Sequence, residues 1–446
     1  MSEPRFSHSL DDLRQMSADV LQLAQAAGAT AAEAEISMGI GQNVSVRLDE
    51  VETIEYNRDR GMSVTVYFGQ RRGHANTSDL SMQALKDTVQ AACSIARYTA
   101  HDDFCGLADP ALLAHDIPDL DLYHPWDISV DEAIELAKRC EGAALATDSR
   151  INNSEGASVS TYGGLFSYAN SNGFNNGYFT SRHSLSCSVI AEEGDNMQRD
   201  YWYSSARAAG DLDSPELVGR QAGERTARRL GAQRLKTAQV PVLFEASVAS
   251  GLLSHFVSAI SGGNLYRKSS FLLDSLGKQV FAPQITISER PHLLRGLASA
   301  PFDNEGVITQ ARDLVVDGVL QGYMLASYSA RKLGMVTTGN AGGNHNLILK
   351  SGDMDFDAML KTMGTGLLVT ELLGHGINMV TGDYSRGAAG FWVENGQIQY
   401  PVEEITIAGN LQDMFRQIVA VGSDILVQGS KQTGSVLIEQ MTIAGE

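Results

Sequence analysis

The sequence predicts an α+β protein in which an N-terminal α/β region precedes a C-terminal, β-rich antiparallel domain of barrel- or sandwich-like form. Helical and strand-like periods alternate in the first half, whereas glycines and hairpin signals dominate after residue 236. A chain of 446 residues also exceeds one ordinary core. We therefore expect an α/β domain at 1–120, a C-terminal domain at 236–446, and a central α/β region at 121–235 that either stands alone or packs with the first domain.

The first elements follow from hydrophobic spacing. Apolar residues recur at helical intervals in residues 11–27 and again in 81–98. Between these helices, apolar and polar residues alternate around 44–48 and 62–66, which predicts half-buried strands. Residues 100–128 are rich in Asp, Pro and His and are expected to form a connection.

The central region begins with a third predicted helix, because Ser129 and Glu132 form a capping-box pattern ahead of an apolar stripe. Residues 151–205 are strand-like, with a turn signal at 170–173. Pro215, which suits the first turn of a helix, predicts a fourth helix after Ser214 that Gly231 closes.

The C-terminal half begins with a buried strand at 242–244 and a helix at 246–261. Two dipeptides suit two-residue type I′ turns, and each lies between apolar runs: Asp317-Gly318 and Asn395-Gly396. The motif Thr-Ile-Ala-Gly occurs at 406–409 and again at 442–445, which indicates a weak repeat or two similar strand ends.

Charge argues against nucleic acid as a direct partner. The formal net charge is -19, and nucleic-acid binding depends on clustered Lys and Arg. One basic stretch lies in and after the fourth helix, and its plainest interpretation is a solvated helix face, with a phosphate or acidic-partner patch as the alternative. It comprises Arg220, Arg225, Arg228, Arg229, Arg234 and Lys236.

Cysteine content and hydropathy predict a cytoplasmic protein. Four cysteines without a C-x-x-C pair do not form a disulfide framework in a chain this long. The first residues lack an apolar signal segment, and no run of about 18 apolar residues predicts a membrane span.

Familiar catalytic motifs are mostly missing from the sequence. There is no P-loop, no G-x-S-x-G elbow and no H-E-x-x-H. Glu371 and His375 stand at helical spacing, although a capped or solvated helix end explains them as well. His255 fits a core or interface histidine, and His345 lies in a Gly/Asn-rich loop that is either a turn or a binding loop.

Long segments nevertheless resemble the TldD/PmbA peptidase family, in its PmbA (TldE) branch. They cover residues 182–193, 262–280, 292–307 and 381–411. The resemblance implies a dimer with a C-terminal β-rich domain. It also implies that TldD-type subunits carry H-E-x-x-x-H on a helix, with two histidines and a later cysteine as zinc ligands and the glutamate as general base.

The sequence departs from that motif at each ligand position. By position, Ser254 replaces the first histidine, His255 the glutamate and Ala259 the second histidine. Neither serine nor alanine suits zinc, and no cysteine follows Cys187. We therefore expect no catalytic residue at these positions and no metal or cofactor in this chain, with zinc in the partner subunit.

The leading hypothesis is a metal-free subunit that pairs with a TldD-type zinc-bearing subunit and acts on unfolded or extended peptides, such as peptide-antibiotic precursors and antitoxins. The chain alone is expected to form a homodimer. Candidate residues for the peptide-cavity wall are Gly262, Gly263, Tyr266, Arg267, Asn344 and His345.

Two alternatives stay open at this point. One is a non-enzymatic modulator that binds a protein partner, as family members have been described to do with DNA gyrase. The other is an autonomous hydrolase whose site would use His255, His345, Glu371 and His375.

Overall fold

The computed structural model describes residues 6–445, and its N-terminal half is built on one antiparallel sheet. The strand order is β3-β2-β1-β4-β5-β6, so the strands of regions 1–120 and 121–235 share a single sheet. The strands are β1 (Ala31–Arg47), β2 (Glu50–Phe68), β3 (Arg71–Thr77), β4 (Ile151–Asn170), β5 (Asn175–Glu193) and β6 (Asn196–Ala206).

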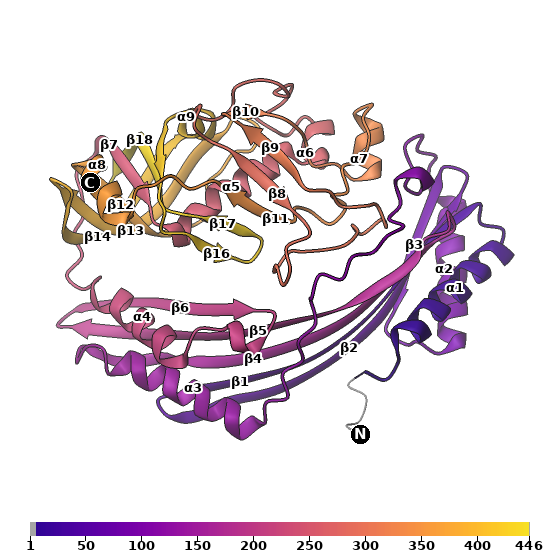
Figure 1. The fold of residues 1–446 in the computed structure, drawn as a ribbon, viewed down its shortest axis with the longest axis horizontal. Helices are drawn as coiled ribbons and strands as arrows, with labels where there is room; N and C mark the ends of the chain where they lie inside the picture. The colour runs from indigo at the N-terminus through magenta and orange to yellow at the C-terminus, as the bar shows by residue number, and fades with distance from the viewer. Residues whose placement is uncertain (1–5, 446) are drawn as a thin grey trace.

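Helices cover one face of this sheet. They are α1 (Leu10–Ala26), α2 (Met82–Tyr98), α3 (Val130–Leu145) and α4 (Pro215–Ala227), with short 3-10 turns η1 (Pro110–Leu112) and η2 (Ala209–Asp211). Even-numbered residues of β1 face the helices along its length: Ile36 packs under α1 and α2, and Val44 packs under α3 and α4. The sheet is curved, and its other face is turned toward the C-terminal domain (Figure 1).

The C-terminal domain contains two further sheets. Their strands are β7 (Ala238–Phe244), β8 (Ile287–Arg290), β9 (Arg312–Val316), β10 (Val319–Leu320), β11 (Asn346–Leu349), β12 (Gly366–Leu373), β13 (Asp383–Glu394), β14 (Gln397–Asn410), β15 (Ile418–Val421), β16 (Leu426–Gln428), β17 (Lys431–Thr433) and β18 (Val436–Ala444). The helices are α5 (Ala246–Ile260), α6 (Gly262–Tyr266), α7 (Ser327–Lys332), α8 (Phe356–Met363) and α9 (Leu411–Arg416).

One of these sheets closes into a barrel. Its order is β14-β13-β12-β7-β18-β15, and an additional pairing of β14 with β18 completes the ring. The repeated Thr-Ile-Ala-Gly segments make this closure, because Thr406 pairs with Ala444 and Ala408 pairs with Thr442 in antiparallel register. The expected barrel- or sandwich-like domain is confirmed, although β7 pairs with β12 in parallel.

Local signals in the sequence placed several boundaries correctly. Ser129 and Glu132 form the capping box of α3. Asp317 and Gly318 both have positive φ and join β9 to β10, and Asn395 and Gly396 do the same between β13 and β14. Such turns require positive φ at both central residues, which Asn, Asp and Gly adopt at low cost.

The prediction of a helix around Glu371 and His375 was wrong. Glu371 lies in strand β12, and His375 follows that strand just after Gly374, whose φ is +73°. Strand β12 is central in the barrel and its residues from Gly366 to Thr370 are buried. The sequence of a strand that is buried on both faces is a continuous apolar run. The spacing of its hydrophobic residues therefore does not distinguish it from a buried helix.

None of the helices in residues 6–445 is both long and apolar enough to cross a membrane.

The close packing of α3 on α4 predicts opposite effects for two helical glycines. A Cβ at Gly219 would lie 1.9 Å from the carbonyl oxygen of Cys140, whereas one at Gly142 meets no atom within 4 Å. Gly219→Ala should therefore destabilise the protein by at least about 1–3 kcal/mol through overpacking. Gly142→Ala should stabilise it by about 0.5–1 kcal/mol, because alanine favours a helix.

Thermal unfolding of both variants beside the parent protein checks this prediction. Equal unfolding temperatures for Gly219→Ala and the parent would contradict the close approach of the two helices.

Candidate functional site

Helix α5 carries Ser254, His255 and Ala259, the residues that the resemblance sets against the zinc motif, and is held by its apolar face. Its sequence is the most apolar of the long helices, and Leu252, Phe256 and Ile260 are buried in the core of the C-terminal domain. Strand β7 leads directly into this helix, and β12 lies beside β7. The helix is therefore fixed by packing on the barrel.

The residues at the predicted motif positions do not present a ligand set. The hydroxyl of Ser254 donates to the carbonyl oxygen of Ser250 at 3.2 Å, within the helix itself. Ala259 has 0% exposure and is part of the core. A serine hydroxyl is a poor zinc ligand, and alanine has no ligand atom in its side chain.

His255 is turned toward an aromatic side chain. Its ring meets Tyr384 of β13 edge-on, with 6.0 Å between ring centroids. Burial, together with the positive charge of Arg386, lowers the pKa of His255 to about 4. Burial raises the pKa of Tyr384 to about 12. The histidine is thus neutral at physiological pH and lacks the carboxylate that the resemblance implies for a general base at this position.

These residues do not fit a zinc ion. Within residues 6–445, no group of three or more His, Cys, Asp or Glu side chains is arranged to hold a metal. The three cysteines that are buried belong to the N-terminal half. Cys93 lies in α2, Cys140 in α3 and Cys187 in β5, and all three are part of the cores between the sheet and its helices.

A cavity of about 270 Å³ lies between the N-terminal sheet and α5. From the sheet, the edge strand β6 contributes Tyr201 and Tyr203, whose rings stack with centroids 6.4 Å apart. From the C-terminal domain come Ser247 and Ser250 of α5 and Arg386 of β13, among other residues. Figure 1 shows β6 as the strand of the curved sheet nearest to this part of the C-terminal domain.

Buried ion pairs join the two halves beside this cavity. Arg225 of α4 binds Glu245 at 2.6 Å and lies 3.4 Å from Asp200 of β6. Arg229 binds Glu371 of β12 at 2.5 Å, and Arg228 binds Glu245 at 3.1 Å. Although burial opposes it, the charges of Arg225 and Arg228 lower the pKa of Glu245 below its usual value.

The basic stretch is therefore only partly a solvated helix face, which corrects the prediction. Arg225 and Arg229 have side-chain exposures of 12% and 10% and neutralise acids of the same chain. Arg220, Arg234 and Lys236 are exposed, as expected. Sequence alone could not distinguish the two sets, because the acids that pair with Arg225 and Arg229 lie in other elements, namely Asp200 in β6, Glu245 at the start of α5 and Glu371 in β12.

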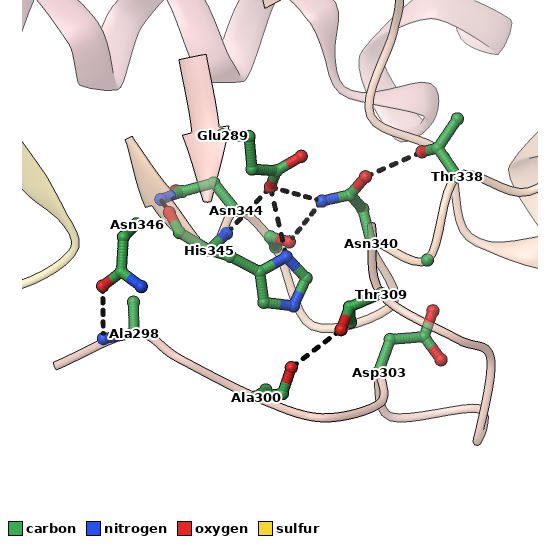
Figure 2. A network of polar contacts seen from close by, with 12 residues as sticks. Glu289, Ala298, Ala300, Asp303, Thr309, Thr338, Asn340, Asn344, His345 and Asn346 are labelled. Atoms are coloured by element: carbon green, nitrogen blue, oxygen red, sulfur yellow. Dashed lines mark hydrogen bonds and ion pairs between the residues drawn. The ribbon is translucent and has the colours of Figure 1, made fainter. Parts of the chain in front are cut away.

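A second polar network surrounds the buried carboxylate of Glu289 in β8 (Figure 2). Its Oε1 accepts hydrogen bonds from the backbone N–H of His345 at 2.9 Å and from Asn340 Nδ2 at 2.8 Å, and His345 Nδ1 lies 3.2 Å away. Arg312 Nε donates to Oε2 at 2.9 Å. Burial opposes ionisation, but the hydrogen bond from His345 and the charge of Arg312 lower the pKa of Glu289 to about 2.

The predicted cavity-wall residues separate into two groups. Gly262, Gly263 and Tyr266 belong to α6, where a Cβ at Gly262 would lie 2.3 Å from Ser329 Oγ of α7. Arg267 stacks on Tyr266, which meets Tyr328 edge-on. Asn344 and His345 instead belong to the loop around Glu289. The cavity beside α5 is lined by other residues.

The four residues considered for an autonomous hydrolase each have a separate environment. His255 contacts Tyr384, His345 binds Glu289 and Glu371 binds Arg229. His375 is exposed. The structure does not bring them together as a metal site within residues 6–445.

Sequence reasoning missed the residues that line the cavity beside α5. The aromatic run Tyr201-Trp202-Tyr203 was a usable signal, because aromatic side chains gathered on an edge strand are typical of binding surfaces, and Tyr201 is exposed. Arg386 carried no signal of its own, since only the pairing of β12 with β13 brings it to the cavity.

The environment of His255 predicts that it stays neutral well below the ordinary histidine pKa. At about pH 5.5 an ordinary histidine is mostly charged, whereas the NMR resonances of His255 should still report the neutral ring. Because the folded pKa lies below the unfolded one, this residue lowers stability as pH falls from 6.5 toward about 4. The signal that disappears in His255→Gln identifies the resonance of this residue. A titration midpoint near pH 6.5 for that resonance would contradict the burial of the ring.

The Glu289 network predicts a pH-dependent loss of stability in Glu289→Gln. Removing the charge leaves Arg312 without its carboxylate, which should cost about 3 kcal/mol at neutral pH. The folded pKa of Glu289 is depressed, so its contribution is present above the ordinary pKa of 4.5 and is lost as pH falls toward about 2.

The difference in unfolding free energy between this variant and the parent should therefore shrink in acid. Glu439→Gln, at an exposed position of β18, is the matched control and should change little. A loss of stability that is the same at pH 7 and in strong acid would refute the charge-based explanation.

Comparison with known proteins agrees with this architecture. Three family models match consecutive parts of the chain: PmbA/TldA metallopeptidase domain 1 at residues 32–96, the central domain at 123–230 and the C-terminal domain at 237–445. A crystal structure of a putative modulator of DNA gyrase from Bacteroides thetaiotaomicron superimposes with a TM-score of 0.92 at 29% identity, covering 98% of this chain and 99% of that one.

Curated relatives extend the match at the sequence level. Metalloprotease PmbA of Escherichia coli O157:H7 is 56% identical over 415 residues, which are 93% of this chain and 92% of that protein. A metalloprotease TldD homolog of Haemophilus influenzae is 24% identical over 414 residues, covering 87% of this chain and 85% of that protein. The chain belongs to the PmbA/TldD family of metallopeptidases.

Proposed function

We propose that this chain is the metal-free, cytoplasmic subunit of a two-subunit zinc peptidase. The observation that carries the proposal is the composition of α5. Ser254 is satisfied within the helix, Ala259 is buried in the core, and the neutral His255 packs on Tyr384. A TldD-type subunit supplies the zinc and the general base, and this chain completes the chamber in which the peptide is cut.

Extended peptides suit the cavity between β6 and α5. Strand β6 ends the order of the N-terminal sheet, and an extended chain can add to such an edge through main-chain hydrogen bonds. Because main-chain hydrogen bonds do not depend on the identity of the side chains, the subunit would accept unfolded peptides of varied sequence. Peptide-antibiotic precursors and antitoxins are the substrate classes that the family resemblance implies.

A binding role without hydrolysis is the competing function. The similar structure from Bacteroides thetaiotaomicron is described as a putative modulator of DNA gyrase. With a net charge of -19, this chain would reach such a target through a protein surface and not through DNA. Dependence of peptide hydrolysis on this chain separates the two functions.

Reconstitution tests the proposed role. The purified chain should contain no stoichiometric zinc and should not hydrolyse an unfolded protein such as casein. Hydrolysis should appear when the chain is mixed with its TldD-type partner, and the two should co-elute as a heterodimer, whereas this chain alone should elute as a homodimer.

Two outcomes would reject the subunit role. One is stoichiometric zinc together with hydrolysis by this chain alone. The other is a partner whose activity is the same with and without this chain.

A further inference from the structure

The cavity beside α5 contains an arginine for which no carboxylate is left. Asp200, Glu245 and Glu371 are the acids in the ion-pair network around this cavity, and Arg225, Arg228 and Arg229 pair with them. Arg386 lines the same cavity and forms no ion pair within residues 6–445. The network therefore has one cation in excess.

The hydrogen-bonding groups of Arg386 are also incompletely used. One terminal nitrogen donates to the carbonyl oxygen of Leu372 at 3.3 Å. Its buried Nε has no well-aligned hydrogen-bond acceptor in the described part of the chain, and the buried hydroxyl of Tyr384, two residues earlier on the same face of β13, lies beside Arg386. A buried donor without an acceptor costs stability unless a ligand supplies that acceptor.

Polar groups surround this arginine. Ser247, Ser250, Thr370 and Gln428 line the same cavity of about 270 Å³, and the stacked Tyr201 and Tyr203 form its wall on β6. Guanidinium groups bind carboxylates through paired, charge-assisted hydrogen bonds. The lining thus offers one guanidinium without a carboxylate partner among the described residues, hydroxyl and amide donors, and an aromatic wall to an extended ligand. Its two acids, Asp200 and Glu371, are already paired with Arg225 and Arg229.

We propose that Arg386 binds a carboxylate of the peptide that enters this cavity. The inference rests on the proposed peptide-binding role of the chain and adds the chemistry that one end of the site recognises. Two groups of a peptide could supply this carboxylate, namely its C-terminus and an acidic side chain within it. The peptides used in the test distinguish the two.

The test measures binding of three N-acetylated alanine–glycine peptides to the full chain by calorimetry. One has a free C-terminal carboxylate, one is its C-terminal amide, and one is an amide with a central glutamate. The free-acid peptide should bind about tenfold more tightly than the amide, as expected for about 1.4 kcal/mol from a charge-assisted pair. Tight binding of the glutamate peptide as well would identify an acidic side chain as a second source.

Two variants assign the effect to Arg386. Arg386→Gln should bring the ratio of acid to amide affinity to about one, and Arg386→Lys should keep part of it, because lysine retains the charge without the planar fork. Arg416→Gln removes an exposed arginine at the end of α9 and should leave the ratio unchanged.

His255 provides a readout that a purely structural role would not move. A bound carboxylate offsets the charge of Arg386, which contributes to the low pKa of His255. The free-acid peptide should therefore raise the NMR titration midpoint of His255, and the amide should leave it in place.

Equal binding of the free acid, the amide and the glutamate-containing amide by the parent chain, or binding of none of the three, overturns the carboxylate site. This comparison holds even if Arg386→Gln fails to fold. The proposed function is judged separately by hydrolysis of the amidated peptide in the mixture with the TldD-type partner. Hydrolysis there, without discrimination between acid and amide, would leave the subunit role intact while rejecting the role of Arg386.

Discussion

The placement of the C-terminal domain over strand β6 depends on charge neutralisation between α4 and three acids that come from distant parts of the chain. Glu245 and Glu371 belong to the C-terminal domain, and Asp200 belongs to β6. Arg225 and Arg229 lie between them with little exposure to solvent. A buried charge is costly unless it is paired, so removing one member would leave another uncompensated. These ion pairs hold α5 and β13 opposite the stacked tyrosines of β6 and thereby fix the walls of the cavity.

Helix α5 is a packing element of the C-terminal domain. Ala259 joins Leu252 and Phe256 in the domain core. His255 retains an imidazole, but burial and the nearby Arg386 disfavour its charged form. The residues of α5 that line the cavity are uncharged. Within residues 6–445, the charged side chain of the cavity that has no partner of opposite charge is Arg386 of β13.

The two polar networks of the C-terminal domain have different consequences. Around Glu289 the partners belong to one domain. The backbone of His345 and the side chain of Asn340 donate to the carboxylate (Figure 2), and Arg312 donates to it as well. That network fixes the loop before β11 and leaves no free charge in it. Around Arg386 the acids are already paired with other arginines, which leaves a cation facing a cavity. The first arrangement stabilises the fold, and the second is suited to a ligand.

The sequence by itself determined the local elements and the absence of the zinc motif. Hydrophobic spacing, the capping box at Ser129 and the hairpin dipeptides at 317–318 and 395–396 each depend on neighbouring residues, and each was placed correctly. Tertiary structure decided that Glu371 lies in a strand, because a central buried strand lacks a diagnostic period. It also decided that Arg225 and Arg229 are buried and that Arg386 reaches the cavity. Those environments arise from pairings between residues far apart in the chain, and no local pattern in a single sequence records such pairings.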